Sequence, residues 1–187
     1  MLSLLEPSAG KLLISEPFLA DPNFQRSVIL IAEYSDAGTL GFVLNQKSDL
    51  LLSDLLPELE HADLPVYFGG PVGTDTLHIV HRCYDKMNEG EEIAAGIYYG
   101  ANIETLRVLC ANNDLKEDEV KFFIGYSGWG ENQLMDELKS NTWIVSDQYH
   151  QDLVFSGNEE EVWREVMINL GPKYAHVVNF PTNPNLN

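Results

Sequence analysis

The chain has 187 residues, of which 44% are hydrophobic and 21% charged, and its 29 acidic against 11 basic side chains give a formal net charge of −18 at pH 7. This length and composition indicate one folded domain with a sizeable core and exclude a disordered chain. Binding to a nucleic-acid backbone requires clustered Lys and Arg. The basic residues here are dispersed along the chain, so the charge disfavours direct nucleic-acid binding.

The N-terminus and the cysteines predict a cytoplasmic protein. The first basic residue is Lys11, so no positively charged segment precedes the apolar stretch at residues 1–5, and no apolar run is long enough to cross a bilayer. Cys83 and Cys110 have no CxxC spacing, and two cysteines in a chain of this length indicate reduced, partly buried thiols. We therefore expect no membrane association and no structural disulfide.

The first half of the chain reads as strands and turns. Apolar and β-branched runs predict strands at residues 11–15, 27–34 and 39–45, with a turn at residues 21–23. The Gly-containing loop at residues 35–38 predicts an antiparallel hairpin between the second and third strands. A short helix at residues 51–56 should stop near Pro57. Two further strands are expected at residues 66–68 and 76–82, on either side of the turn at residues 69–71.

The second half adds longer helices. A helix should start after Asn102 as its N-cap, with an apolar face that packs on the sheet. A strand at residues 120–126 should be followed by a turn at residues 127–130, a helix at 131–139 and a strand at 142–146. The clearest helix follows Asn158, has three glutamates in its first turn and ends at Gly171-Pro172. The domain is expected to span residues 1–180, with residues 181–187 as a flexible tail.

Two glycine-rich turns are the candidate site for a ligand or a protein partner, because glycine allows close approach to exposed main chain. The alternative is that both are simple tight turns whose φ angles require glycine. If the turns meet, they form a cleft. The candidate residues are Tyr67, Gly69, Gly70, Pro71, Ser127, Gly128, Trp129 and Gln133.

The sequence contains no catalytic or metal-binding constellation. The segment from Gly125 to Gly130 resembles the GxSxG nucleophile elbow but fails the pattern at Trp129, so we expect Ser127 to be a helix N-cap. His78 and His81 are three residues apart on a strand and should point to opposite faces, with one of them buried and hydrogen-bonded. We therefore assign no catalytic residue, no metal and no cofactor.

Five separated motifs together resemble the YqgE/AlgH family of bacterial proteins. They are Gly10-Lys11-Leu12-Leu13-Ile14-Ser15, Phe24-Gln25-Arg26-Ser27-Val28-Ile29-Leu30, Gly38-Thr39-Leu40-Gly41-Phe42-Val43-Leu44-Asn45, Gly69-Gly70-Pro71-Val72, and Gly128-Trp129 with Gln133-Leu134 and Glu137-Leu138. The resemblance runs from about Gly10 to Leu170. It implies a single α+β domain with a bent, largely antiparallel, bifurcated sheet of barrel-like form and packed helices, and an effect on transcription.

Two functions are consistent with this pattern. The leading hypothesis is a regulatory protein that acts through an unknown protein partner, since the charge disfavours DNA and the sequence shows no helix-turn-helix. The second is a small-molecule-binding protein or enzyme that uses a cleft between residues 69–72 and residues 127–133. The sequence names neither the ligand nor the partner.

Overall fold

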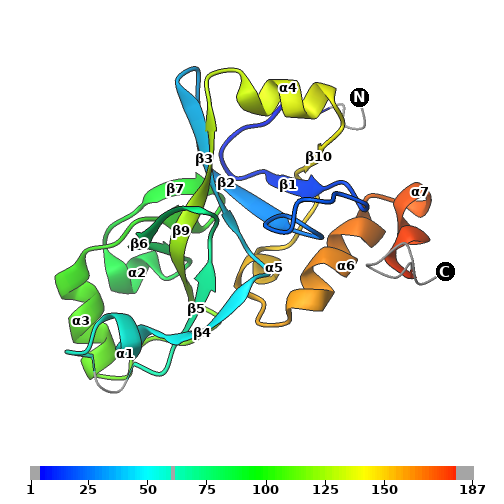
Figure 1. Ribbon diagram of the computed structural model, residues 1–187. Coiled ribbons are helices and arrows are strands. Elements are labelled where there is room, and N and C mark those ends of the chain that lie inside the picture. Colours follow the sequence, from blue (N-terminus) through cyan, green and yellow to red (C-terminus); the bar gives the residue numbers. More distant parts are fainter. Residues whose placement is uncertain (1–4, 60–61, 180–187) are drawn as a thin grey trace.

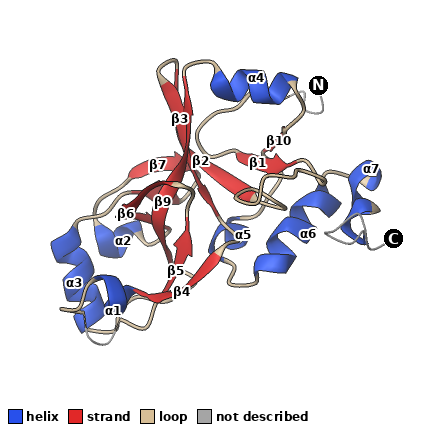
Figure 2. Cartoon of the chain, viewed as in Figure 1, coloured by secondary structure: helices blue, strands red, loops and turns tan. Residues whose placement is uncertain are grey.

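Ten strands form one branched sheet in the computed structural model, which describes residues 5–59 and 62–179 (Figures 1 and 2). Every strand pair is antiparallel except β5 with β9. The strands are β1 (Leu12–Ser15), β2 (Val28–Ser35), β3 (Gly38–Val43), β4 (Lys47–Leu51), β5 (Pro65–Phe68), β6 (Val72–His81), β7 (Glu91–Ala94), β8 (Ile97–Tyr99), β9 (Val120–Gly130) and β10 (Trp143–Ser146).

The long strand β9 joins the two halves of this sheet. Its first part pairs with β5 and β6, and its last four residues pair with β3. The strand order is therefore β10-β1-β2-β3-β9-β6-β8-β7, with β4 and β5 on a branch. Gly125 lies at the change of partner with a left-handed φ of 66°, a conformation that glycine accepts without strain. The expected bifurcation of the sheet is thus present.

The expected barrel-like closure is not found. The outer strands β10 and β7 each have one partner strand, and β4 ends the branch, so the sheet stays open among the described residues. A closed barrel requires every strand to pair on both sides. Here β9 pairs with strands of both sheet halves, and the two halves diverge from it. Helices cover the diverging halves.

Seven α-helices and one 3₁₀ helix cover the described sheet in three groups (Figure 1). Helices α1 to α3 lie beside β5 and β6, α4 lies at the opposite end beside β10, and α5 to α7 lie near β1. Their bounds are α1 (Leu52–Leu55), α2 (Tyr84–Met87), α3 (Ile103–Ala111), α4 (Gln133–Lys139), α5 (Gln151–Phe155), α6 (Glu159–Asn169), α7 (Pro172–Ala175) and η1 (Val177–Asn179).

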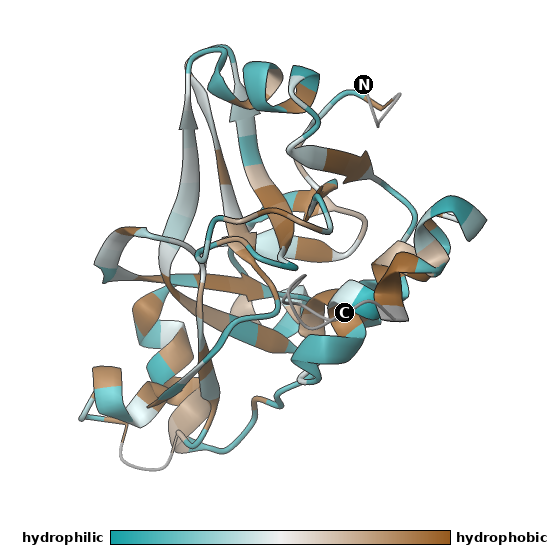
Figure 3. Ribbon diagram, turned by 45° about the vertical axis from the view of Figure 1, so that its right-hand side comes forward, coloured by the Kyte–Doolittle hydropathy of each residue, from teal (hydrophilic) through white to brown (hydrophobic). Residues whose placement is uncertain are grey.

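Both faces of the β1–β2 region are buried. Leu12, Ile14 and Leu30 pack against α5 and α6, whereas Leu13 and Ile29 alternate with them and pack toward α4. A strand that is buried on both faces needs an unbroken apolar run, which is why the sequence from residue 28 to 31 has no polar position. A third cluster lies between β6, β9 and helices α1 to α3. Figure 3 shows the hydrophobic colour on strands and on parts of the helices.

Local capping chemistry places the longer helices where the sequence predicts them. The Asn102 side chain accepts from the backbone N–H groups of Glu104 and Thr105, and Asn158 accepts from that of Glu161. Both asparagines satisfy N–H groups that the first helical turn leaves without partners. The predicted tail at residues 181–187 lies outside the described residues. Within the described chain, no helix has the length and apolar character needed to cross a membrane.

Candidate functional site

The two glycine-rich segments are in contact. Gly69 donates its N–H to the carbonyl of Ile124 at 3.0 Å and accepts from the N–H of Val43 at 3.0 Å. Gly70 has a φ of 150°, and a Cβ on it would lie 2.3 Å from the carbonyl carbon of Tyr126. Only glycine lets the backbone approach this closely. The condition for a cleft, that the two segments meet, is therefore fulfilled, with Gly70 lying directly over β9.

The segment from Ser127 to Gly130 is a strand, so its prediction as a turn is wrong. It continues β9 and pairs with β3 in register, with Ser127 opposite Gly41 and Trp129 opposite Thr39. An available neighbouring strand overrides the turn preference of Gly and Ser in this segment. Ser127 is fully buried, and its hydroxyl donates to the Gly69 carbonyl at 3.0 Å.

Ser127 is also not the N-cap of the following helix. The N-cap of α4 is Asn132, in a left-handed conformation with a φ of 60°. A buried hydroxyl that donates to a backbone carbonyl is neither a cap nor an exposed nucleophile. The resemblance of this segment to a nucleophile elbow therefore has no geometric counterpart.

One carboxylate fixes two tryptophans beside this junction. Glu137 accepts through Oε2 from the indole N–H of Trp129 at 2.8 Å and from that of Trp143 at 2.7 Å. Its Oε1 accepts from the side-chain amide of Gln133 at 3.0 Å. The indole rings meet edge to face, with centroids 5.8 Å apart. This shared acceptor holds α4 against the ends of β9 and β10 and satisfies both buried indoles.

A groove of about 420 Å³ opens over these rings, and we call it the Trp129 groove. The turn after β5, the loop from residue 16 to 26, α4 and β10 all contribute to it. Its lining contains acidic, amide and apolar side chains and no lysine or arginine. The residues are Leu19, Asp21, Phe24, Pro71, Val72, Gly128, Trp129, Gln133, Glu137, Thr142 and Trp143.

The Trp129 groove unites half of the predicted site residues and leaves the other half outside. Pro71, Gly128, Trp129 and Gln133 line it, whereas Gly69, Gly70, Ser127 and Tyr67 do not. The two glycines and Ser127 form the packed base of the junction. Tyr67 belongs to the core on the side of α5 and α6, where burial raises the pKa of its hydroxyl to about 12.

Sequence reasoning missed the groove residues that come from distant segments. Phe24 meets Trp143 edge to face at 5.4 Å between centroids, and Leu19 lies half-buried in the same loop. Next to them Phe18 is 56% exposed, and Val72 on β6 is 40% exposed. Phe24 and Val72 fall within family motifs, and Val72 within the predicted cleft at residues 69–72, but no local motif marks Phe18 or Leu19. Only the apolar character of residues 18, 19 and 24 in an otherwise loop-like segment signals that they contact something.

The two histidines of β6 point apart, as expected. His78 Nδ1 lies 3.1 Å from the hydroxyl of Tyr99, while the His81 ring stacks on Tyr98. Tyr98 and Tyr99 are successive residues of β8 and so face opposite sides. Burial lowers the pKa of both imidazoles. No cluster of three His, Cys, Asp or Glu side chains suited to a metal occurs within the described residues.

Buried groups elsewhere include both thiols and one lysine that the sequence did not single out. Cys83 and Cys110 are free and buried. Lys121 on β9 is only 2% exposed, and its Nζ donates to the Ser156 carbonyl at 2.8 Å and lies 4.0 Å from the Tyr67 ring centroid. Burial lowers the Lys121 pKa to about 7, against the opposing effect of Glu159.

Comparison with known proteins identifies relatives along nearly the whole chain. Residues 12–175 match the model of a family described as AlgH-like, DUF179. A UPF0301 protein of Cytophaga hutchinsonii is 38% identical over 95% of this chain and 98% of its own length. A UPF0301 protein of Bacteroides thetaiotaomicron is 35% identical over 97% of this chain and 92% of its own length.

Two solved structures share the fold. A crystal structure of a Corynebacterium diphtheriae protein superposes with a TM-score of 0.74 at 25% identity, covering 94% of each chain. The solution structure of the AlgH protein from Pseudomonas aeruginosa superposes with a TM-score of 0.73 at 25% identity, covering 95% of this chain and 98% of that protein. The family model and these matches together show that the chain belongs to the AlgH-like family.

Proposed function

We propose that this chain is a regulatory protein that acts by binding another protein through the Trp129 groove. The observation that carries the proposal is the exposure of apolar side chains at a fixed, hollowed surface. Val72 in the groove and Phe18 beside it are 40% and 56% exposed, next to buried tryptophans that Glu137 holds in place. Rigid aromatic surfaces with exposed apolar neighbours are typical of the centres of protein interfaces.

The charge of the surface supports a partner that carries basic side chains. The groove is lined by Asp21 and Glu137 but by no basic side chain, and the whole chain carries a net charge of −18. Such a surface attracts a segment that presents an apolar side chain flanked by Lys or Arg, and it repels nucleic acid. An effect on gene expression would then pass through that partner and not through direct contact with DNA.

The contacts of the polar groups near the groove favour binding over catalysis. Glu137 already accepts three hydrogen bonds, which use three of its about four lone-pair positions, and the Ser127 hydroxyl is buried against Gly69. A general base or a nucleophile needs a free lone pair directed at a substrate. The alternative of a small-molecule ligand in the same groove remains a second hypothesis, supported by the 420 Å³ volume.

The test compares two valines that are exposed on different faces. Val72→Lys adds a positive charge to the groove, whereas Val108→Lys alters a 59% exposed valine on α3. A partner captured from a bacterial lysate should be purified and its Kd measured with each variant. We expect Val72→Lys to weaken binding at least about tenfold, and Val108→Lys to leave it unchanged.

The salt dependence of the same Kd provides a second measurement. Because the partner segment is expected to be basic, raising the salt concentration should weaken binding to the wild type. Equal affinity of the wild type and Val72→Lys for every purified partner would refute the assignment of the groove. Binding of a small molecule that Val72→Lys abolishes, without any captured protein, would support the second hypothesis instead.

A further inference from the structure

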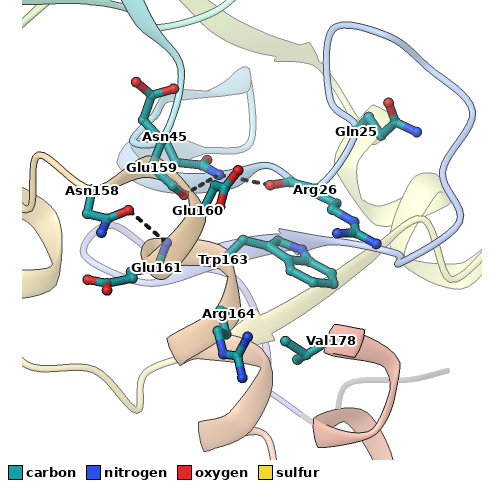
Figure 4. Close-up of a pocket in the computed structure, with 10 residues that line it drawn as sticks. All are labelled: Gln25, Arg26, Asn45, Asn158, Glu159, Glu160, Glu161, Trp163, Arg164 and Val178. Atoms are coloured by element: carbon teal, nitrogen blue, oxygen red, sulfur yellow. Dashed lines mark hydrogen bonds between the residues drawn. The ribbon is translucent and has the colours of Figure 1, made fainter. Parts of the chain in front are cut away.

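A second hollow, of about 660 Å³, lies at the N-terminus of α6, away from the Trp129 groove (Figure 4). Its volume is in the range of small-molecule sites. We call it the Arg26–Trp163 pocket. The segments that line it are the two residues shortly before β2, Asn45, the first turns of α6, and η1. The lining residues are Gln25, Arg26, Asn45, Asn158, Glu159, Glu160, Glu161, Trp163, Arg164 and Val178.

The indole of Trp163 supplies an unused donor in the wall of this pocket. Trp163 is 3% exposed, and its Nε1 has no hydrogen-bond partner within the described residues. The indole groups of Trp129 and Trp143 both donate to Glu137, so the chain satisfies the two other described indoles. A buried N–H without an acceptor is costly, and a bound ligand oxygen is one way to satisfy it.

Two guanidinium groups flank this indole. The Arg26 guanidinium lies over the Trp163 ring, with Cζ 4.8 Å from the centroid. Arg164 follows Trp163 on α6, is exposed, and forms no ion pair with another described residue. In Figure 4 the Trp163 ring is seen between the Arg26 and Arg164 side chains. Guanidinium groups are well suited to bind carboxylate or phosphate oxygens.

The loop that carries Arg26 is held in place. Arg26 has a left-handed φ of 51°, which is unusual for a residue with a long side chain. The Asn45 side chain fixes it by donating to the Arg26 carbonyl at 2.9 Å and accepting from the Val28 N–H at 2.9 Å. Non-glycine residues in such conformations are found where surrounding structure holds them, often at binding sites.

The carboxylates of the first turn limit how much negative charge the pocket accepts. Glu159, Glu160 and Glu161 all line the hollow, although Figure 4 shows the Glu161 carboxylate directed away from Trp163. Three glutamates beside two arginines disfavour a polyanion. A ligand with one anionic group, and an uncharged remainder that fills the hollow, fits this charge pattern best.

We propose that the Arg26–Trp163 pocket binds a small organic anion through one carboxylate or phosphate group. An oxygen of that group accepts from the Trp163 indole N–H, and the group pairs with the guanidinium groups of Arg26 and Arg164. This pocket shares no lining residue with the Trp129 groove, although Phe24 of the groove and Gln25 of the pocket are consecutive in the chain.

The three tryptophans make the test internally controlled. The indole N–H resonances of ¹⁵N-labelled protein are followed by NMR during titration with acetate, as the carboxylate arm, and with inorganic phosphate, as the phosphate arm. Sodium chloride at equal ionic strength is the reference. We expect at least one of the two anions to shift the Trp163 resonance in a saturable manner, while the Trp129 and Trp143 resonances, whose protons face Glu137, stay in place.

Three surface variants test the assignment without disturbing the core. Arg164→Gln should raise the Kd of the bound anion about tenfold or more, and Glu160→Gln should lower it. Arg107→Gln, on α3 and paired with Glu58 and Glu104, is the matched control and should leave the Kd unchanged. The proposal is overturned if neither anion moves the Trp163 resonance beyond chloride, or if Arg164→Gln binds as the wild type does.

Discussion

Replacing Lys121 with methionine tests whether a buried cation sets the pH dependence of stability. The ammonium group is 2% exposed, donates to the Ser156 carbonyl and lies over the Tyr67 ring, but no carboxylate pairs with it among the described residues. Burial therefore lowers its pKa from an ordinary 10.5 to about 7. A buried charge without an ion-pair partner is expensive, and methionine has a similar length without the charge.

The sign of the effect follows from proton binding. Because the folded pKa is lowered, the unfolded chain binds more protons than the folded chain between pH 7 and 10.5. The free energy of unfolding of the wild type therefore gains a contribution that rises with pH over this window, by up to about 1.4 kcal/mol per pH unit. Below pH 7 the contribution is constant and destabilising, by roughly 4 to 5 kcal/mol relative to a neutral lysine.

Urea unfolding followed by tryptophan fluorescence from pH 6.5 to 9.5 measures this contribution. Lys121→Met should lack the rising component, so the difference in unfolding free energy between variant and wild type should shrink as the pH rises. The unpaired Ser156 carbonyl offsets part of the gain by about 1–3 kcal/mol, but it does so equally at every pH. Other groups titrate in both proteins, and their effects cancel in the difference.

The exposed Lys116 provides the control, since Lys116→Met should follow the pH dependence of the wild type. Parallel curves for Lys121→Met and the wild type would refute the reasoning. Such curves would mean that water or a carboxylate reaches Lys121 and keeps its pKa near the ordinary value.

Three further measurements test the packing around the Trp129 groove and the two thiols. Gly70→Ala should lower the free energy of unfolding by about 3 kcal/mol or more, because the added Cβ would lie 2.3 Å from the Tyr126 carbonyl carbon. Gly100→Ala is the control, since Gly100 has a left-handed φ of 92° but nothing lies within 4 Å of its Cβ position. It should lower the free energy of unfolding by less in the same urea assay. Glu137→Ala leaves two buried indole N–H groups without an acceptor, so it should lower Tm and reduce the free energy of unfolding by about 2–4 kcal/mol. Glu137→Gln keeps an acceptor oxygen and should reduce the free energy of unfolding by less. Equal reductions in the two variants would contradict the shared-acceptor geometry. Burial raises the pKa of Cys83 to about 11 and also raises the pKa of Cys110. Both thiols should therefore react with iodoacetamide at pH 8 far more slowly in the native protein than in urea. Equal reaction rates in the two conditions would show that the thiols are accessible in the native protein.

Much of the local structure could be predicted from the sequence because it depends on neighbouring residues. The hairpin at residues 35–38 follows from its glycine-containing loop, and α3 and α6 begin at the asparagines whose side chains cap them. The family motifs could also be recognised directly. These features need no information from distant parts of the chain.

Short strands and the end of β9 could not be predicted in this way. β4, β7 and β8 have only three to five residues, and polar or mixed sequences such as those of β4 and β7 carry no strong periodicity. The segment from Ser127 to Gly130 has turn residues but becomes strand because β3 supplies its hydrogen-bond partners. Pairing with the distant strand β3 outweighed the local turn preference of this segment.

The sequence by itself determined the acidity and the motifs that identify the family. Only the tertiary structure decided which residues share a surface. Alternation along β9 places Lys121 and Phe123 on one face, but the α5–α6 connection that buries Lys121 arrives 35 residues later. Likewise Phe24 and Trp143 meet in the groove through β1 and β10, because a sheet brings strands together by hydrogen bonding and not by sequence proximity.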